Sequence, residues 1–345
     1  DAVLEQEPDN VSAQMSMLDY YKKSGEDSLA QATVERILIS DKTPSADKIQ
    51  LLRKVVDENE HIGAGSMEII HLFNRILAEP QTTPEMAALY AAYLKLKEYP
   101  QDSIDVVLER VLEIAPDEAG ARLQLIQSAW GKRDFDRVIE LSRPAQQYNP
   151  DELAFYYFMA MAYNQQDNID DALVTIRRGV TVANVQTNKE LVSDLYGLMG
   201  EMYHEKGMDK EAFAAYDSCL IWNSENIGCL NNYAYYLSLT GNGLQKAEQM
   251  SYKTVKAEPD NGTYLDTYAW ILFMQGRYEE AKIYIEQALK NYKTPSADVI
   301  EHAGDIFWKC GDRNAAVEYW KQAVDAGGSD SVLKKKLKQK KYLNK

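Results

Sequence analysis

The chain has 345 residues, of which 45% are hydrophobic and 26% charged, and its formal net charge at pH 7 is −15. This composition is that of a folded protein and not of a disordered one. The negative charge disfavours the binding of nucleic acid over most of the surface. The sequence shows no apolar run long enough to span a bilayer and no signal-peptide pattern, so we expect this stretch of chain neither to cross nor to enter a membrane.

The predicted helices follow one another with a regular period. Proline ends helices because it lacks an N–H, and seven of the ten prolines fall on a ladder, with steps of 34 or 36 residues between Pro8 and Pro150 and of 36 residues between Pro259 and Pro295. Predicted second helices recur with steps of 34 to 40 residues, at Ala30, Glu68, Ile104, Val138, Ala172, Ala212, Ala247, Ala281 and Ala316. A period just above 34 residues indicates a solenoid of helix-turn-helix repeats.

The N-terminal half of the ladder is the less regular part. Residues 1–10 are expected to be the end of a repeat truncated upstream, and what precedes Asp1 could be another repeat, a secretion signal or a lipid anchor. Residues 11–184 are predicted to form repeats of partly degenerate pattern. An insertion at residues 185–190 lengthens one step to 40 residues and is the best candidate for a seam between subdomains.

Residues 191–330 are predicted to hold the regular repeats, and the clearest of these spans 264–288. Its first helix carries an apolar stripe of helical spacing, and its second helix presents small or branched residues towards the first: Leu265, Tyr268, Ala269, Leu272, Ala281, Ile285 and Ala288. Gly276 is expected to end the first helix, because glycine enters the left-handed cap conformation freely. The template resembles the tetratricopeptide repeat. That resemblance implies an all-α, right-handed superhelical solenoid of about nine repeats.

The last predicted helix, residues 331–345, is rich in lysine. Leu333 and Leu337 are expected to face inward, with lysines around them at positions 334, 335, 336, 338, 340 and 341. Because a terminal repeat needs a polar outer face, a capping helix is the favoured interpretation. The alternative is a basic module that contacts a membrane surface or nucleic acid.

Two segments near the C-terminus, Tyr264–Trp270 and Glu301–Trp308, resemble a bacterial branch of tetratricopeptide proteins. Members of that branch are often exported, many as lipoproteins, and serve as scaffolds. The resemblance implies a periplasmic location, or membrane attachment through a removed N-terminal signal, with the cytoplasm as the alternative.

Stacked helix pairs bind partners in a concave groove lined by first helices. If the apolar stripe faces the core, the opposite face of three consecutive first helices should form that groove, with the residues Asn231, Tyr235, Asp266, Trp270, Phe273, Glu301, Asp305 and Trp308. Aromatic residues flanked by carboxylates favour a protein or peptide partner with basic or aromatic residues. The competing interpretation is that Trp270 and its neighbours pack a core.

The sequence predicts no enzyme, cofactor site or metal site. Cys219, Cys229 and Cys310 form no CxxC pair and are expected to be small apolar packing residues. Glu301 and His302 are adjacent, but no second histidine or carboxylate follows at ligand spacing. No glycine-rich phosphate loop or Ser-His-Asp order occurs. The predicted function is therefore that of a protein-binding scaffold.

Overall fold

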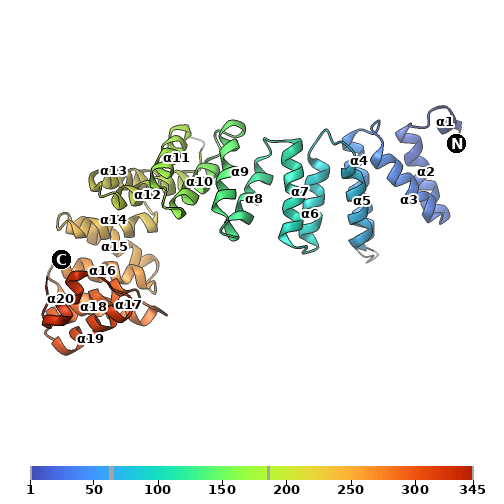
Figure 1. Ribbon diagram of the computed structural model, residues 1–345. Helices are drawn as coiled ribbons and strands as arrows, with labels where there is room; N and C mark the ends of the chain where they lie inside the picture. Colours follow the sequence, from blue (N-terminus) through green and yellow to red (C-terminus); the bar gives the residue numbers. More distant parts are fainter. Residues whose placement is uncertain (1, 62–65, 185–186, 344–345) are drawn as a thin grey trace. The chain divides into compact units, whose positions relative to one another are not determined.

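The computed structural model describes residues 2–61, 66–184 and 187–343, and all regular structure in these ranges is helical (Figure 1). The chain divides into two compact units, Asp1–Asn168 and Ile169–Lys345. The division lies upstream of the insertion at residues 185–190. Within that insertion, residues 185 and 186 lie outside the described residues, so a seam there stays a prediction.

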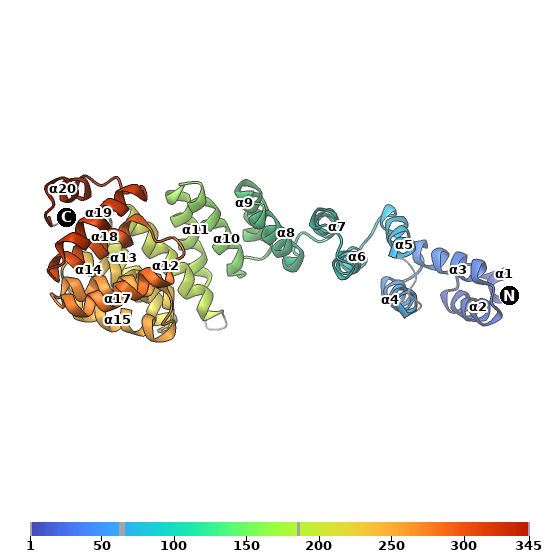
Figure 2. The same cartoon turned by 90° about the horizontal axis from the view of Figure 1, so that it is seen from below.

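Ten helices belong to the first unit: α1 (Ala2–Gln6), α2 (Val11–Ser24), α3 (Asp27–Ile39), α4 (Ser45–His61), α5 (Ser66–Ala78), α6 (Glu85–Leu96), α7 (Gln101–Ile114), α8 (Ala119–Gly131), α9 (Phe135–Tyr148) and α10 (Leu153–Gln165). Ten belong to the second: α11 (Ile169–Val182), α12 (Lys189–Glu205), α13 (Asp209–Trp222), α14 (Ile227–Leu239), α15 (Leu244–Ala257), α16 (Gly262–Met274), α17 (Tyr278–Asn291), α18 (Ala297–Lys309), α19 (Arg313–Asp325) and α20 (Ser331–Gln339). Helices pack in consecutive pairs within each unit, such as α6 with α7 (Figure 2). Another such pair is α16 with α17. The prediction of an all-α, paired-helix fold is confirmed.

Glycine allows close approach where the paired helices meet. A Cβ added at Gly200 would lie 2.5 Å from the ring of Tyr216, and one added at Gly304 would lie 2.4 Å from the ring of Trp320. Both rings are fully buried. A bulky aromatic residue of the second helix thus fills the space that glycine leaves on the first.

Most turns between paired helices in the described ranges place a residue with positive φ two positions after the first helix ends, whereas the turn after α2 has it one position after, at Gly25. Gly276 takes this position with φ of 80°, as predicted, after α16 ends at Met274. In the less regular part of the chain the same position is filled without glycine, by Glu98, Arg133 and Asp167. The turn geometry is therefore kept although these residues adopt it at a cost.

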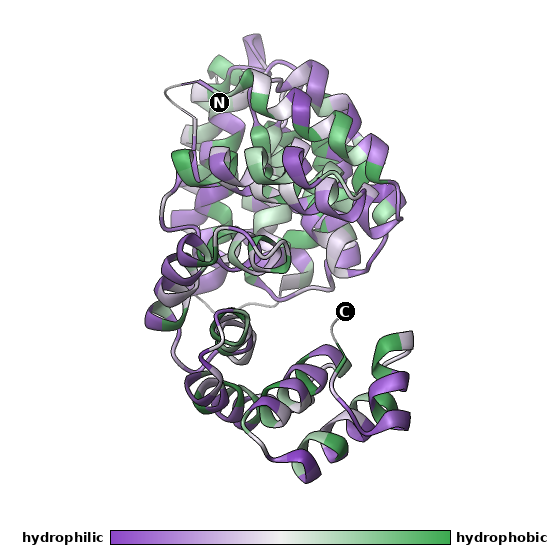
Figure 3. Cartoon of the chain, turned by 90° about the vertical axis from the view of Figure 1, so that its left-hand side faces the viewer, coloured by the Kyte–Doolittle hydropathy of each residue, from purple (hydrophilic) through white to green (hydrophobic). Residues whose placement is uncertain are grey.

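The predicted apolar stripes form the core. Leu265 and Leu272 of α16 are buried, and Ala281, Ile285 and Ala288 of α17 are fully buried against them. In Figure 3 most helices carry both hydrophobic and hydrophilic stretches, which is the pattern expected of amphipathic helices. α16 departs from it, because ten of its thirteen residues are buried. This helix is packed on nearly every side.

Candidate protein-interaction surface

The eight residues predicted to line a groove come from three first helices of the second unit. Asn231 and Tyr235 lie on α14, Asp266, Trp270 and Phe273 on α16, and Glu301, Asp305 and Trp308 on α18. α14 contacts α16, and α16 contacts α18. The first helices are therefore in direct contact on the side where the groove was expected.

His302 of α18 lies where the three helices meet. Its Nδ1 is 3.0 Å from Oδ1 of Asp266, and its ring stacks on Trp270 with 4.1 Å between ring centroids. The ring of Tyr235, on α14, has its centroid 6.3 Å from that of His302. Residues two repeats apart thus converge on one histidine, which the sequence could not show.

The expected exposure of the groove is wrong for most of its residues. Only Tyr235 and Trp308 are half-buried, and the other six are buried: Asn231, Asp266, Trp270, Phe273, Glu301 and Asp305. The physical reason is that the first helices approach closely enough to cover one another's inner faces. A second cover comes from the C-terminal segment, which we define as residues 331–343.

The C-terminal segment places a lysine among the predicted acidic groove residues. Lys336 of α20 is fully buried, and its Nζ donates hydrogen bonds to Glu301 Oε1 at 2.8 Å and to Asp305 at 2.9 Å (Oδ1) and 2.6 Å (Oδ2). The indole N–H of Trp320 donates to Asp305 Oδ1 at 2.9 Å. Lys336 was expected among the outward lysines, and this is corrected: it faces inward beside the buried Leu333.

The environment of Asp305 disfavours its charged form. Burial raises the pKa of this carboxyl, while the charge of Lys336 and the hydrogen bond from it act in the opposite direction. Tyr342, from the same C-terminal segment, packs at 6.1 Å between ring centroids from Phe273. The chain's own lysine and tyrosine occupy the places where a basic or aromatic partner residue was expected.

In the second unit, the first helices α12 and α14 carry neighbouring side chains that stay accessible, and we call this surface the α12–α14 face. Its five half-buried side chains are Glu201, His204, Asn232, Tyr235 and Tyr236. Asn232 donates to Glu201 Oε1 at 2.6 Å, and the ring of His204 stacks on Tyr236 with 3.7 Å between centroids. Burial raises the pKa of Glu201. The sequence analysis missed Tyr236, because it took the groove positions of one repeat and applied the same positions to the preceding repeat, where they selected only the neighbouring Tyr235.

The cysteines and other ligand-type residues offer no sign of a metal centre in the described ranges. No three His, Cys, Asp or Glu side chains there lie together as a metal site. Cys219 and Cys229 are buried free thiols, and Cys310 is half-buried and donates to the carbonyl of Tyr278. No helix among the described residues is long and apolar enough to cross a membrane.

Comparison with known proteins relates one helix pair of the second unit to a repeat family. Residues 263–294, which include all of α17 and all but the first residue of α16, match the tetratricopeptide repeat family. A TPR repeat-containing protein of Pseudomonas aeruginosa is 32% identical over 81 residues, which is 24% of this chain and 13% of that protein. The family match thus covers one helix pair of the second unit, and the chain's match spans a small part of that relative's length.

Two solved structures show the same fold. A tetratricopeptide repeat protein from Parabacteroides merdae has a TM-score of 0.51 and 16% identity, over 74% of this chain and 98% of that one. PilW, described as a widely conserved type IV pilus biogenesis factor, has a TM-score of 0.52 and 17% identity, over 63% of this chain and 97% of that one. Both likenesses concern the fold alone.

Proposed function

We propose that the chain is a non-enzymatic scaffold that binds a segment of a partner protein on the α12–α14 face. The observation that carries the proposal is that this face remains half-exposed, whereas the inner faces of α16 and α18 are covered by the chain itself. Tetratricopeptide repeats generally bind proteins through first helices, and half-exposed aromatic residues beside polar groups are typical anchors at such interfaces.

The charge of the α12–α14 face indicates the chemistry of the partner. Among the described residues no lysine, arginine or histidine forms an ion pair with Glu201, and burial already raises the pKa of this carboxyl. A lysine or arginine of the partner would supply the missing positive charge and hydrogen-bond donors. A guanidinium can also stack on the rings of Tyr235 and Tyr236. We therefore propose a partner segment that carries a basic residue.

Affinity capture from native host extract tests this function. The double variant Glu201→Gln, Tyr236→Ala removes the carboxylate charge and one ring, and Glu211→Gln with Tyr252→Ala is the matched control, because both control side chains are exposed elsewhere in the unit. We expect quantitative mass spectrometry to show a protein retained by the control and lost by the face variant, with unchanged circular dichroism. Identical capture by both variants would locate binding elsewhere.

The location and the alternative function are also proposals. The segments Tyr264–Trp270 and Glu301–Trp308 resemble exported bacterial scaffolds, and on this resemblance we propose a periplasmic or membrane-attached protein; cell fractionation distinguishes this from a cytoplasmic one. The alternative function is contact with a membrane surface or nucleic acid through the lysine-rich C-terminal helix. Five exposed lysines could make this contact, at positions 334, 335, 338, 340 and 341. This alternative predicts sedimentation with phosphatidylglycerol vesicles that is lost when these lysines are replaced by glutamine.

A further inference from the structure

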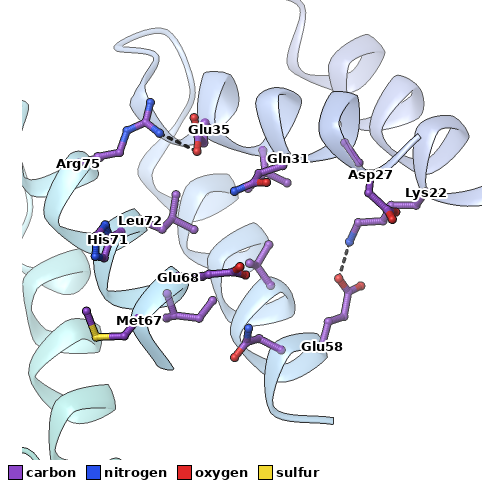
Figure 4. A pocket seen from close by; sticks show the side chains of 15 residues that line it. Lys22, Asp27, Gln31, Glu35, Glu58, Met67, Glu68, His71, Leu72 and Arg75 are labelled. Carbon is purple, nitrogen blue, oxygen red and sulfur yellow. Dashed lines mark hydrogen bonds and ion pairs between the residues drawn. The ribbon is translucent and has the colours of Figure 1, made fainter. Parts of the chain in front are cut away.

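A cavity of about 700 Å³ lies in the first unit, far in sequence from the α12–α14 face. Its walls come from α3, α4 and α5, with Lys22 of α2 at one edge (Figure 4). The apolar lining includes Val34, Val55, Ile69 and Leu72. The volume falls within the range of about 300–1,000 Å³ that is typical of ligand-binding pockets.

Ion pairs stand at two sides of this cavity. Arg75 Nη1 lies 2.7 Å from Glu35 Oε1, and Lys22 pairs with Glu58. Figure 4 shows the two pairs on opposite sides, with Gln31 between them. Each positive charge of the lining, His71 aside, is thus already matched by a carboxylate.

Three further polar side chains of the lining could each accept a hydrogen bond or pair with a cation beyond the contacts they make among the described residues. Asp27 and Glu68 are exposed carboxylates that form no hydrogen bond or ion pair within the described residues. Asn59 is 7% exposed, and its Oδ1 has no hydrogen-bond partner. A buried acceptor without a donor costs about 1–3 kcal/mol in general. Two unmatched negative charges and an unmatched acceptor both favour a ligand that brings positive charge and N–H donors.

We infer that this cavity is a second protein-binding site, which takes an amphipathic helix with a lysine or arginine beside its apolar stripe. Three helices form the walls, and a fourth helix completes such an arrangement by packing its ridges into their grooves. Its apolar residues would pack against the exposed Met67 and the half-buried Val55, and its cation would lie near Asp27 and Glu68. This site is independent of the proposed function, because no residue of the α12–α14 face takes part in it.

A displayed library of helical peptides tests the inference with the whole chain as bait. The library holds 15-residue peptides with apolar residues fixed at i, i+3 and i+7 and all other positions randomised. We expect enriched peptides to carry lysine or arginine next to the stripe. The charge-reversal variant Asp27→Lys, Glu68→Lys should weaken a synthetic enriched peptide about tenfold or more in fluorescence anisotropy, and selection against it should enrich acidic peptides instead.

Two further variants separate the cavity from general electrostatics and from misfolding. Gln31→Trp places a large ring on the rim of the cavity and should abolish peptide binding while circular dichroism stays unchanged. Asp151→Lys adds the same kind of charge at an exposed carboxylate of the first unit outside the cavity, and should leave binding unchanged. Enrichment of peptides without a basic residue, or equal binding by Gln31→Trp, would overturn the inference. Neither result bears on the α12–α14 face.

Discussion

Replacing Lys336 by methionine should release the C-terminal segment from the second unit. Methionine is close to lysine in length and can fill the same space, so the substitution removes the positive charge with little change of volume. Asp305 would then be a buried carboxylate that has lost its cation, and Glu301 would lose the hydrogen bond from Lys336. Removal of one partner from a buried ion pair generally costs about 3–5 kcal/mol.

How strongly α20 is attached decides whether this loss of stability detaches α20 or unfolds the whole unit. Leu333 is the apolar side chain of α20 that is fully covered, and burial of a leucine contributes about 1.5–3 kcal/mol. The expected penalty equals or exceeds this contribution, so the segment should detach before the helices of the unit separate. We expect hydrogen–deuterium exchange of residues 331–343 to become fast in Lys336→Met at pH 7, while α16 and α18 stay protected.

The penalty should also depend on pH. Burial raises the folded-state pKa of Asp305, and Lys336 opposes this rise, so the pKa rises further in the variant. A carboxyl with a raised folded-state pKa contributes stability below its unfolded pKa of about 4 and loses it as pH rises through the folded-state value. The variant should therefore lose more stability at pH 7 than at pH 4. Unchanged protection of residues 331–343 at pH 7, or a penalty independent of pH, would refute this reasoning.

Three substitutions test the turns, the helices and the close contacts of the repeats. Glu98→Gly should stabilise the first unit by about 0.5–1 kcal/mol in urea denaturation. Glycine adopts positive φ without strain, and the greater flexibility of the unfolded chain offsets part of this stabilisation. The control Gln127→Gly, in the middle of α8, should instead destabilise the unit by about 1 kcal/mol. If Glu98→Gly does not stabilise the unit, the φ of 54° at Glu98 costs little free energy. Gly304→Ala should cost about 1–3 kcal/mol, because the new Cβ would lie 2.4 Å from Trp320, and an unchanged urea midpoint would contradict that close contact.

The paired helices were predictable from the sequence because each depends on local spacing. The apolar stripe of α16 and the small residues of α17 recur in a window shorter than one repeat, and Gly276 marks the turn between them. Even where glycine is absent, as at Arg133, the flanking stripes were sufficient to place two helices. The positive φ at Arg133 could not be predicted, because a non-glycine residue gives no sign of that conformation.

The covered inner face was not predictable in the same way. Contact between Tyr235 and His302 joins residues that are two repeats apart, so it depends on how far each pair rotates relative to the next. The position of the C-terminal segment likewise depends on where the chain turns after α19. The periodicity of one helix carries no information on either quantity, so Trp270 could be placed on the correct side of its helix but not assigned as exposed or buried.

Two signals in the sequence nevertheless pointed to burial. α16 ends in the consecutive apolar residues Trp270 to Met274, and a helix that is apolar on all sides is expected in a core and not at a groove. In α20, Lys336 follows Leu333 by three positions and so belongs to the same stripe. A lysine on an apolar stripe needs a buried carboxylate as its partner, and Glu301 and Asp305, four residues apart on one face of α18, offer two. The acidic row is thus suited to a basic group, and the group that it holds belongs to the same chain.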